Sequence, residues 1–313
     1  MRIIRHLKNI DDISPCALTI GNFDGVHLGH QKIIEATKER AKRHNLKSAA
    51  LTFFPHPIKF FRPDLAQNFL ISSLARKLKT LKQHSFDYVF VLPFDQNFSN
   101  ISPEDFIAKV LIKQLKMREL IIGYDFTFGK NRQGNFDFLK QKSNSLDFGV
   151  QSIEAFMKSE ILCSSSKVRE LLKLGKVDQA GEILGRNFEI EGVVLNGKKL
   201  ARTIGFPTLN LAAKPHLIQP KFGVYKVEVF IPSLQKNFSG VMNFGVKPTI
   251  GNFLAPIYEI HLFDFDEKIY GPLYGKKIIA QLLDFIREEK KFSSIDELKK
   301  QIEIDVSRAK SRT

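Results

Sequence analysis

The chain has 313 residues, with 43% hydrophobic and 26% charged residues and a net charge of +15. This composition is that of a globular protein long enough for two domains. No apolar run approaches the roughly 18 residues that a membrane-spanning helix requires, and the charged start MRIIRHLKNIDD is atypical of a signal peptide. Cys16 and Cys163 do not stand at metal-ligand spacing, so we expect a reducing, cytoplasmic location.

The N-terminal part alternates between short apolar runs and helical patterns. The predicted strands read CALTIGNF, SAALTFFP, DYVFVLPF and ELIIGYDF. The predicted helices between them read HQKIIEATKERAKRHN, SLARKLKTLKQH and SPEDFIAKVLIKQL. The last of these helices has Ser102 as its N-cap and Pro103 at the first helical position. This alternation predicts an α/β domain with a parallel sheet and crossover helices.

After about Gly185 the pattern changes to short strands. They read FEIEGVVL, GVYKVEVFI, FSGVMNFGV, IYEIHLFDF and KKIIAQLLDFI, and a helix capped by Ser293 or Ser294 closes the chain. Successive strands with short turns predict an antiparallel sheet or small barrel. We therefore expect two domains, residues 1–185 and residues 186–313.

The stretch TIGNFDGVHLGH, residues 19–30, joins a predicted strand to a predicted helix. Ligands bind at the carboxyl ends of strands in an open α/β sheet, and a helix N-terminus there favours phosphate. His27 and His30 would face such phosphates and stabilise charge on a phosphorus centre, while Gly29 keeps the space between them clear. The alternative is two ordinary surface histidines beside a tight turn.

The same stretch resembles, almost letter for letter, the opening motif of the bacterial bifunctional riboflavin kinase/FAD synthetases. The H-x-G-H part belongs to the wider nucleotidylyltransferase superfamily. The resemblance implies a Rossmann-like nucleotidylyltransferase domain in which His27 and His30 are catalytic. It also implies that the rest of the motif binds ATP and its phosphates, namely Gly21, Asn22, Phe23, Asp24, Gly25 and Gly29.

Three later stretches continue this resemblance in family order. TFFPHP implies that His56 lies near the ATP phosphates, and GYDFTFGKNRQG implies that Asp125 and Phe126 bind the flavin. CSSSKVRELL implies phosphate contacts from Ser164, Ser165 and Arg169. Pro-His-Pro alone could be a rigid turn, and the serines alone could be a helix N-cap. Together these residues imply that an FMN phosphate oxygen attacks the α-phosphorus of ATP in line, with Mg²⁺, to give FAD and pyrophosphate.

The second half contains a misleading motif and a better one. GVVLNGKK, residues 192–199, almost spells a Walker phosphate loop, but Lys199 stands where a hydroxyl residue is needed and no helix follows. ARTIGFPTLN, residues 201–210, instead resembles the riboflavin kinase motif G-R-T-x-G-[FY]-P-T-A-N, with Ala201 and Leu209 as departures.

This second resemblance implies a six-stranded antiparallel Greek-key barrel with a closing helix. Its ATP-binding residues would be Thr203, Gly205 and Pro207, and its Mg²⁺ ligands would be Thr208 and Asn210, whose oxygens suit magnesium. Glu259 would be the general base for the riboflavin ribityl hydroxyl, and Arg287 would face the flavin. A solvent-facing Glu in an alternating strand is the alternative for Glu259.

The resemblance implies that riboflavin and ATP give FMN, and that FMN and a second ATP give FAD. We expect the partners to be riboflavin, FMN and ATP, with no nucleic acid and no membrane, and the sequence leaves the oligomeric state open. Three alternatives remain. The chain could join a different nucleotidylyltransferase to an unrelated barrel, or bind nucleic acid through its charge. One domain could also be inactive, with the substitutions at Ala201 and Leu209 pointing to the kinase.

Overall fold

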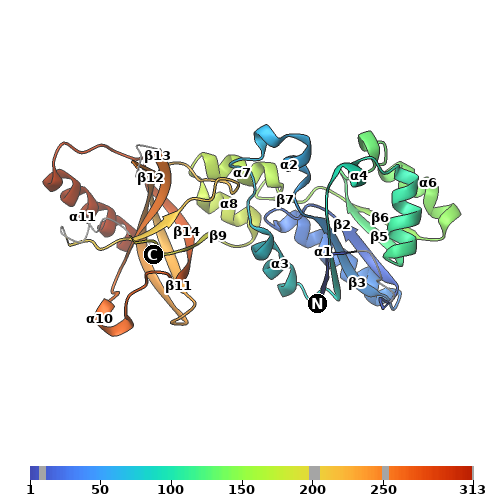
Figure 1. Cartoon of the computed structure of the whole chain (residues 1–313), viewed down its shortest axis with the longest axis horizontal. Helices are drawn as coiled ribbons and strands as arrows, with labels where there is room; N and C mark the ends of the chain where they lie inside the picture. Colours follow the sequence, from blue (N-terminus) through green and yellow to red (C-terminus); the bar gives the residue numbers. More distant parts are fainter. Residues whose placement is uncertain (7–11, 197–204, 249–253, 312–313) are drawn as a thin grey trace. The chain divides into compact units, whose positions relative to one another are not determined.

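The structure is a computed structural model that describes residues 1–6, 12–196, 205–248 and 254–311 (Figure 1). Contacts within the chain divide it into two units, Met1–Ser165 and Ser166–Thr313. Each unit is built around one six-stranded sheet.

The first unit contains a wholly parallel sheet with the order β1-β4-β3-β2-β5-β6. Its strands are β1 (Arg2–Ile4), β2 (Cys16–Ile20), β3 (Lys47–Phe53), β4 (Tyr88–Leu92), β5 (Met117–Gly123) and β6 (Gly149–Ile153). The four predicted strands are β2 to β5, and the predicted parallel sheet is confirmed. The strand order reverses at β2, which lies between β3 and β5. The carboxyl end of β2 is therefore the switch point at which such sheets bind ligands.

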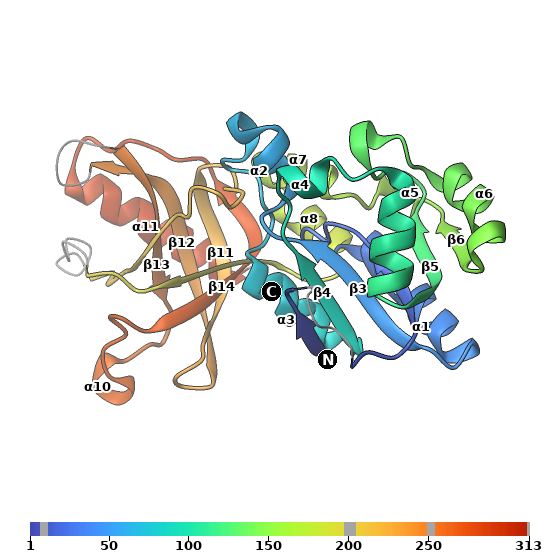
Figure 2. The same ribbon diagram turned by 45° about the vertical axis from the view of Figure 1, so that its right-hand side comes forward.

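Helices cover both faces of this sheet (Figure 2). The longer ones are α1 (Leu28–Arg43), α3 (Leu74–Gln83), η2 (Phe106–Gln114) and α6 (Phe136–Leu146). Successive residues of β2 point to opposite faces, because strand side chains alternate. Ala17 packs with Ala41 of α1, whereas Leu18 belongs to the cluster that contains Leu111 of η2 and Leu139 of α6.

Shorter elements complete the first unit. They are α2 (Pro57–Phe61), η1 (Pro63–Leu65), α4 (Gln96–Ser99), α5 (Pro103–Asp105), η3 (Lys130–Arg132), β7 (Met157–Lys158) and β8 (Ile161–Leu162). The predicted helix from Ser102 is divided into α5 and the π-type helix η2, and the Ser102 hydroxyl accepts the Asp105 amide at 3.1 Å as predicted. Both cysteines, Cys16 and Cys163, are buried and unpaired in this unit.

The second unit contains an antiparallel sheet with the order β10-β13-β12-β11-β14-β9. Its strands are β9 (Phe188–Val193), β10 (Leu209–Ala212), β11 (Gly223–Ile231), β12 (Lys236–Pro248), β13 (Leu254–Leu262) and β14 (Lys277–Arg287). Strand β14 returns beside β11, which is a Greek key. The amide of Leu195, just after β9, donates to the Asn210 carbonyl of β10 at 2.8 Å, so the two ends of the sheet meet. The predicted six-stranded Greek-key barrel is confirmed.

Helices pack around this barrel. They are α7 (Ser165–Lys173), α8 (Val177–Leu184), α10 (Glu267–Tyr270) and the predicted closing helix α11 (Ile295–Ser311). Ala309 of α11 packs in a cluster with Val224, Val241 and Ile286 of the sheet. The Lys221 amide donates to the Leu172 carbonyl of α7 at 2.9 Å. The contacts divide the chain after Ser165, and the domain boundary predicted at residue 185 stays a prediction.

Candidate active sites

The loop after β2 adopts an unusual backbone conformation. Within four residues it has positive φ angles at Phe23 (47°), Gly25 (83°) and Val26 (44°). A bulky or β-branched residue rarely adopts a positive φ, because each such residue costs about 1–3 kcal/mol and persists only where its surroundings hold it. The predicted ATP-binding residues of this motif therefore lie in a loop that needs support from the rest of the unit.

His27 and His30 lie against one another at the start of α1. Their rings stack with centroids 3.7 Å apart. His27 is the N-cap of α1, and its Nδ1 accepts the His30 amide at 3.3 Å. Because Nδ1 accepts a hydrogen bond, the neutral His27 ring carries its proton on Nε2. The His27 ring is therefore set to donate a hydrogen bond from Nε2.

Gly29 lies where a side chain would collide with its neighbours. A Cβ atom at this position would lie 2.8 Å from the Cys163 carbonyl oxygen and 3.1 Å from His27 Nδ1. A side chain there would displace either the Cys163 backbone or the His27 ring. The predicted role of Gly29 as a spacer therefore has a geometric basis.

A buried network of hydrogen bonds holds the loop after β2 in place. Asp24 is 1% exposed, and its carboxylate accepts the amides of Ile71 at 3.0 Å and Ser72 at 3.3 Å. The Asn22 carbonyl accepts hydrogen bonds from Lys77 Nζ at 2.6 Å and from the Thr52 hydroxyl at 3.2 Å. These bonds tie the loop to β3, to α3 and to the segment that precedes α3.

The ionisable groups of this network have shifted pKa values. Burial lowers the pKa of Lys77 to about 8, and the nearby Asp24 carboxylate opposes this shift. Burial also lowers the pKa of His30 well below its ordinary value, and the electrostatic effects of the neighbouring His27 and Lys77 lower it further. His30 is therefore neutral at physiological pH. Its Nδ1 is buried and has no hydrogen-bond partner among the residues that the structure describes.

Other predicted residues follow neighbouring strands at the same edge of the sheet. His56, just after β3, is the N-cap of α2, and its Nδ1 accepts the Ile58 amide at 3.1 Å. Asp125 and Phe126 follow β5, where the Phe126 amide donates to the Gly123 carbonyl at 3.1 Å. Because β3 and β5 flank β2, the chain brings these three segments to one edge.

The serine-rich stretch also reaches the loop. The Ser165 hydroxyl donates to the Asp24 carbonyl at 2.9 Å, and Ser164 precedes it at the start of α7. Arg169 lies further along α7, in the part assigned to the second unit. Its predicted phosphate contact stays a prediction.

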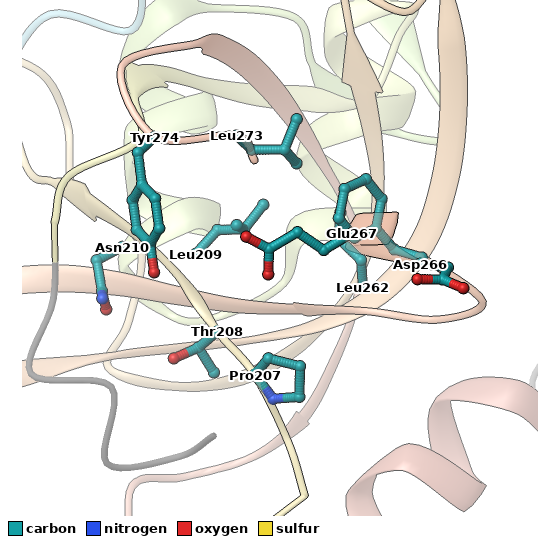
Figure 3. A pocket seen from close by; sticks show the side chains of 10 residues that line it. Pro207, Thr208, Leu209, Asn210, Leu262, Asp266, Glu267, Leu273 and Tyr274 are labelled. Carbon is teal, nitrogen blue, oxygen red and sulfur yellow. The ribbon is translucent and has the colours of Figure 1, made fainter. Parts of the chain in front are cut away.

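The second candidate site is a cavity of about 320 Å³ in the barrel unit. Its lining consists of Pro207, Thr208, Leu209, Asn210, Leu262, Phe265, Asp266, Glu267, Leu273 and Tyr274. Figure 3 shows the Thr208 hydroxyl and the Glu267 carboxylate around the same space, with the Tyr274 ring along one side. The Pro207 carbonyl lies 3.0 Å from His261 Nδ1, which fixes the entry to β10. The predicted Mg²⁺ ligands thus line one cavity with oxygen donors and apolar side chains.

Glu259 lies next to this cavity by strand register. It is directly opposite Asn210 of β10 on one side and Asn243 of β12 on the other. Gly205 has a φ of 91°, which favours glycine, and its position has open space around it. Thr203, like Ala201, lies outside the described residues.

Arg287 has a partner within its own unit. Its guanidinium donates to both carboxylate oxygens of Asp305, with distances of 2.7 to 3.0 Å. The two side chains are 17% and 4% exposed, so this is a largely buried ion pair between β14 and α11. The predicted flavin contact of Arg287 stays a prediction beside this structural role.

Comparisons with known proteins match both parts of the chain. The FAD synthetase family model matches residues 9–167, and the riboflavin kinase family model matches residues 184–313. Bifunctional riboflavin kinase/FMN adenylyltransferases from Haemophilus influenzae and Escherichia coli K12 are 40% and 36% identical, and the alignments cover 99% and 97% of this chain and 99% and 96% of theirs. The chain belongs to this family.

The chain is therefore an enzyme with two activities, riboflavin kinase and FMN adenylyltransferase, as the sequence predicted. A solved structure from Streptococcus pneumoniae, described as a macrolide-efflux protein, superimposes with a TM-score of 0.89 over the whole of both chains, at 27% identity. That description applies to the S. pneumoniae protein. In the described ranges of this flavin enzyme, none of the helices is both long and apolar enough to cross a membrane.

Sequence reasoning missed the supporting residues of both sites. Lys77 lies in an ordinary amphipathic helix, where lysines usually face solvent. Glu267 and Tyr274 of the barrel cavity come from the segment between β13 and β14, which has no recognisable pattern.

Proposed function

We propose that the loop after β2 performs adenylyl transfer and that the barrel cavity performs the phosphorylation of riboflavin. The observation that carries the first assignment is the stacked pair of His27 and His30 at the N-terminus of α1. The second assignment is supported by Thr208 and Asn210 in one cavity, with Glu259 opposite Asn210.

In the adenylyl transfer, an oxygen of the FMN phosphate attacks the α-phosphorus of ATP. The new bond joins this oxygen to the α-phosphorus, and the bond to the β-phosphate oxygen breaks, so that pyrophosphate leaves. His27 donates from Nε2 to the charge that builds up on the phosphate oxygens, and the amides at the start of α1 add to this stabilisation. The remaining motif residues, with His56, Ser164, Ser165 and Arg169, hold the phosphates, while Asp125 and Phe126 contact the flavin.

In the phosphorylation, Glu259 accepts the proton of the terminal ribityl hydroxyl of riboflavin as its oxygen attacks the γ-phosphorus of ATP. ADP leaves and FMN forms. Thr203, Gly205 and Pro207 contact ATP, and Arg287 contacts the flavin in this proposal.

Mg²⁺ fits the kinase cavity by its donor chemistry. The Thr208 hydroxyl and the Asn210 amide supply hard oxygen ligands, and Mg²⁺ in phosphate-transferring sites takes few protein ligands and completes its shell with phosphates and water. When bound, Mg²⁺ neutralises charge on the ATP phosphates. We also propose a cytoplasmic location, where the thiols of Cys16 and Cys163 stay free, and a domain boundary near residue 185.

A chromatographic product assay tests the proposal. The purified chain is incubated with riboflavin, ATP and Mg²⁺, and FMN and FAD are followed over time. We expect FMN to rise first and then to convert to FAD. FMN without FAD would refute the assignment of the first site, and FAD from added FMN without any use of riboflavin would refute that of the second.

A further inference from the structure

Lys77 of α3 is buried against the loop that leads from β2 to His27 and His30. Its side chain is 5% exposed. Its Nζ donates to the Asn22 carbonyl at 2.6 Å and to the Thr52 hydroxyl at 3.3 Å, and Thr52 in turn donates to the same carbonyl at 3.2 Å. The three groups form a closed triangle that fixes the peptide at residue 22. A lysine buried to this degree is rare and needs a specific reason.

The triangle holds a strained segment. Phe23 and Val26 have φ angles of 47° and 44°, which persist only where the surroundings determine them. The Asp24 carboxylate holds the same segment through the amides of Ile71 and Ser72. The backbone that places His27 is therefore held at two points. The Lys77 ammonium binds the carbonyl of Asn22, and the carboxylate of Asp24 binds the amides of Ile71 and Ser72.

Lys77 also acts on the histidines through its charge. Its ammonium lowers the pKa of His30, and His27, whose ring centroid is 3.7 Å away, also lowers it. Asp24 faces Lys77 and favours its charged form. The ammonium is thus a buried positive charge on the protein side of a loop whose other side faces phosphates in the proposed reaction.

We propose that Lys77 is a positioning residue for adenylyl transfer: its buried ammonium fixes the loop that carries His27 and His30 and supplies positive charge beneath the bound phosphates. The inference rests on the proposed role of that loop. A methionine would fill nearly the same volume but could neither donate to the Asn22 carbonyl nor carry a charge, whereas an arginine would keep both the donor and the charge.

The charge predicts a pH dependence with a definite sign. The pKa of Lys77 is about 8, so the ammonium loses its proton as the pH rises through about 8. The value of kcat/KM reports groups of the free enzyme. We therefore expect kcat/KM for FMN adenylylation to fall above about pH 8, whereas riboflavin phosphorylation by the same chain lacks this dependence on Lys77.

The test compares Lys77→Met and Lys77→Arg with wild type across the pH range, with FMN and ATP as substrates. Lys77→Met should lower kcat/KM by about 10- to 10³-fold below pH 8 and remove the alkaline fall, because losing a charge that stabilises a transition state has effects of this size. Lys77→Arg should move the fall to much higher pH, since a guanidinium stays charged. Lys79→Met, an exposed lysine of the same helix, is the matched control and should match wild type.

The outcomes separate this inference from the proposed function. Failure of wild type to make FAD from FMN would refute the proposed function of the loop itself. If wild type makes FAD and Lys77→Met keeps either its rate or its alkaline fall, Lys77 is not the positioning charge. Riboflavin phosphorylation in each preparation serves as the internal activity control. Should Lys77→Met not fold, Lys77→Arg decides alone: a fall that stays at pH 8 overturns the inference.

Discussion

The two sites of this enzyme are built in opposite ways. The proposed adenylyltransferase site lies on a strained loop whose groups are held by buried polar contacts from β3, α3 and Ser165. The proposed kinase site lies on neighbouring strands, where the register places Asn210 opposite Glu259. We therefore expect the first site to depend on supporting residues outside the substrate contacts, and the second to depend mainly on the residues that line it.

The sharpest test of the comparison is Glu259→Gln. The amide keeps the shape of the side chain but cannot accept the ribityl proton, so riboflavin phosphorylation should fall by about 10²–10⁴-fold. Conversion of added FMN to FAD should remain at the wild-type rate, measured by chromatography in the same preparation. Glu303→Gln, on the exposed side of α11, is the control. A loss of both activities in folded protein would contradict two separate sites.

His30→Ala should produce the complementary result. Loss of one preorganised group at the phosphates lowers adenylyl transfer by about 10²–10³-fold. Riboflavin phosphorylation should be unchanged, so FMN accumulates in the coupled assay. His44→Ala, at the other end of α1, provides the control. Normal FAD production by His30→Ala would remove His30 from the reaction.

Gly29→Ala examines the dependence of the first site on its supports. The added Cβ would lie 2.8 Å from the Cys163 carbonyl, so either that backbone or the His27 ring must shift. Small displacements of this kind lower the rate steeply, and we expect about a 10-fold loss of kcat for FAD formation. Gly181→Ala is the control, because its Cβ would meet nothing closer than 3.6 Å. An unchanged kcat would show that the loop tolerates movement.

Asp305→Asn should have the smallest effect on chemistry and a clear effect on stability. Breaking a buried ion pair leaves Arg287 uncompensated and costs about 3 kcal/mol. The unfolding transition of the barrel in urea should shift accordingly, while kcat of the kinase changes little. If Arg287→Met raises the KM for riboflavin and Asp305→Asn does not, the predicted flavin contact of Arg287 is supported over a purely structural role.

The sequence predicted the strands and the motif residues better than the buried charged residues that hold them in place. Strands β2 to β5 are apolar runs between turn signals, so their pattern was sufficient. Strand β1 has three residues of which two are exposed, and β6 has an exposed central residue between half-buried ones, so neither presents a clear apolar pattern. The motif residues could be located by their resemblance to a family.

Lys77 and Asp305 could not be located in this way. Each is a charged residue in an amphipathic helix, and only the packed structure shows that it is buried against a partner. Burial of a charge depends on contacts between segments far apart in sequence, which helical periodicity does not report.

The state of the two cysteines has a practical consequence for fluorescence work on the enzyme. Burial raises the pKa of the Cys16 thiol to about 12, and it also raises that of Cys163. The reactive thiolate is therefore scarce at both positions near pH 8, and neither side chain is open to reagents. A cysteine introduced at Ile269, which is 71% exposed, would accept a maleimide dye selectively without removal of the native cysteines.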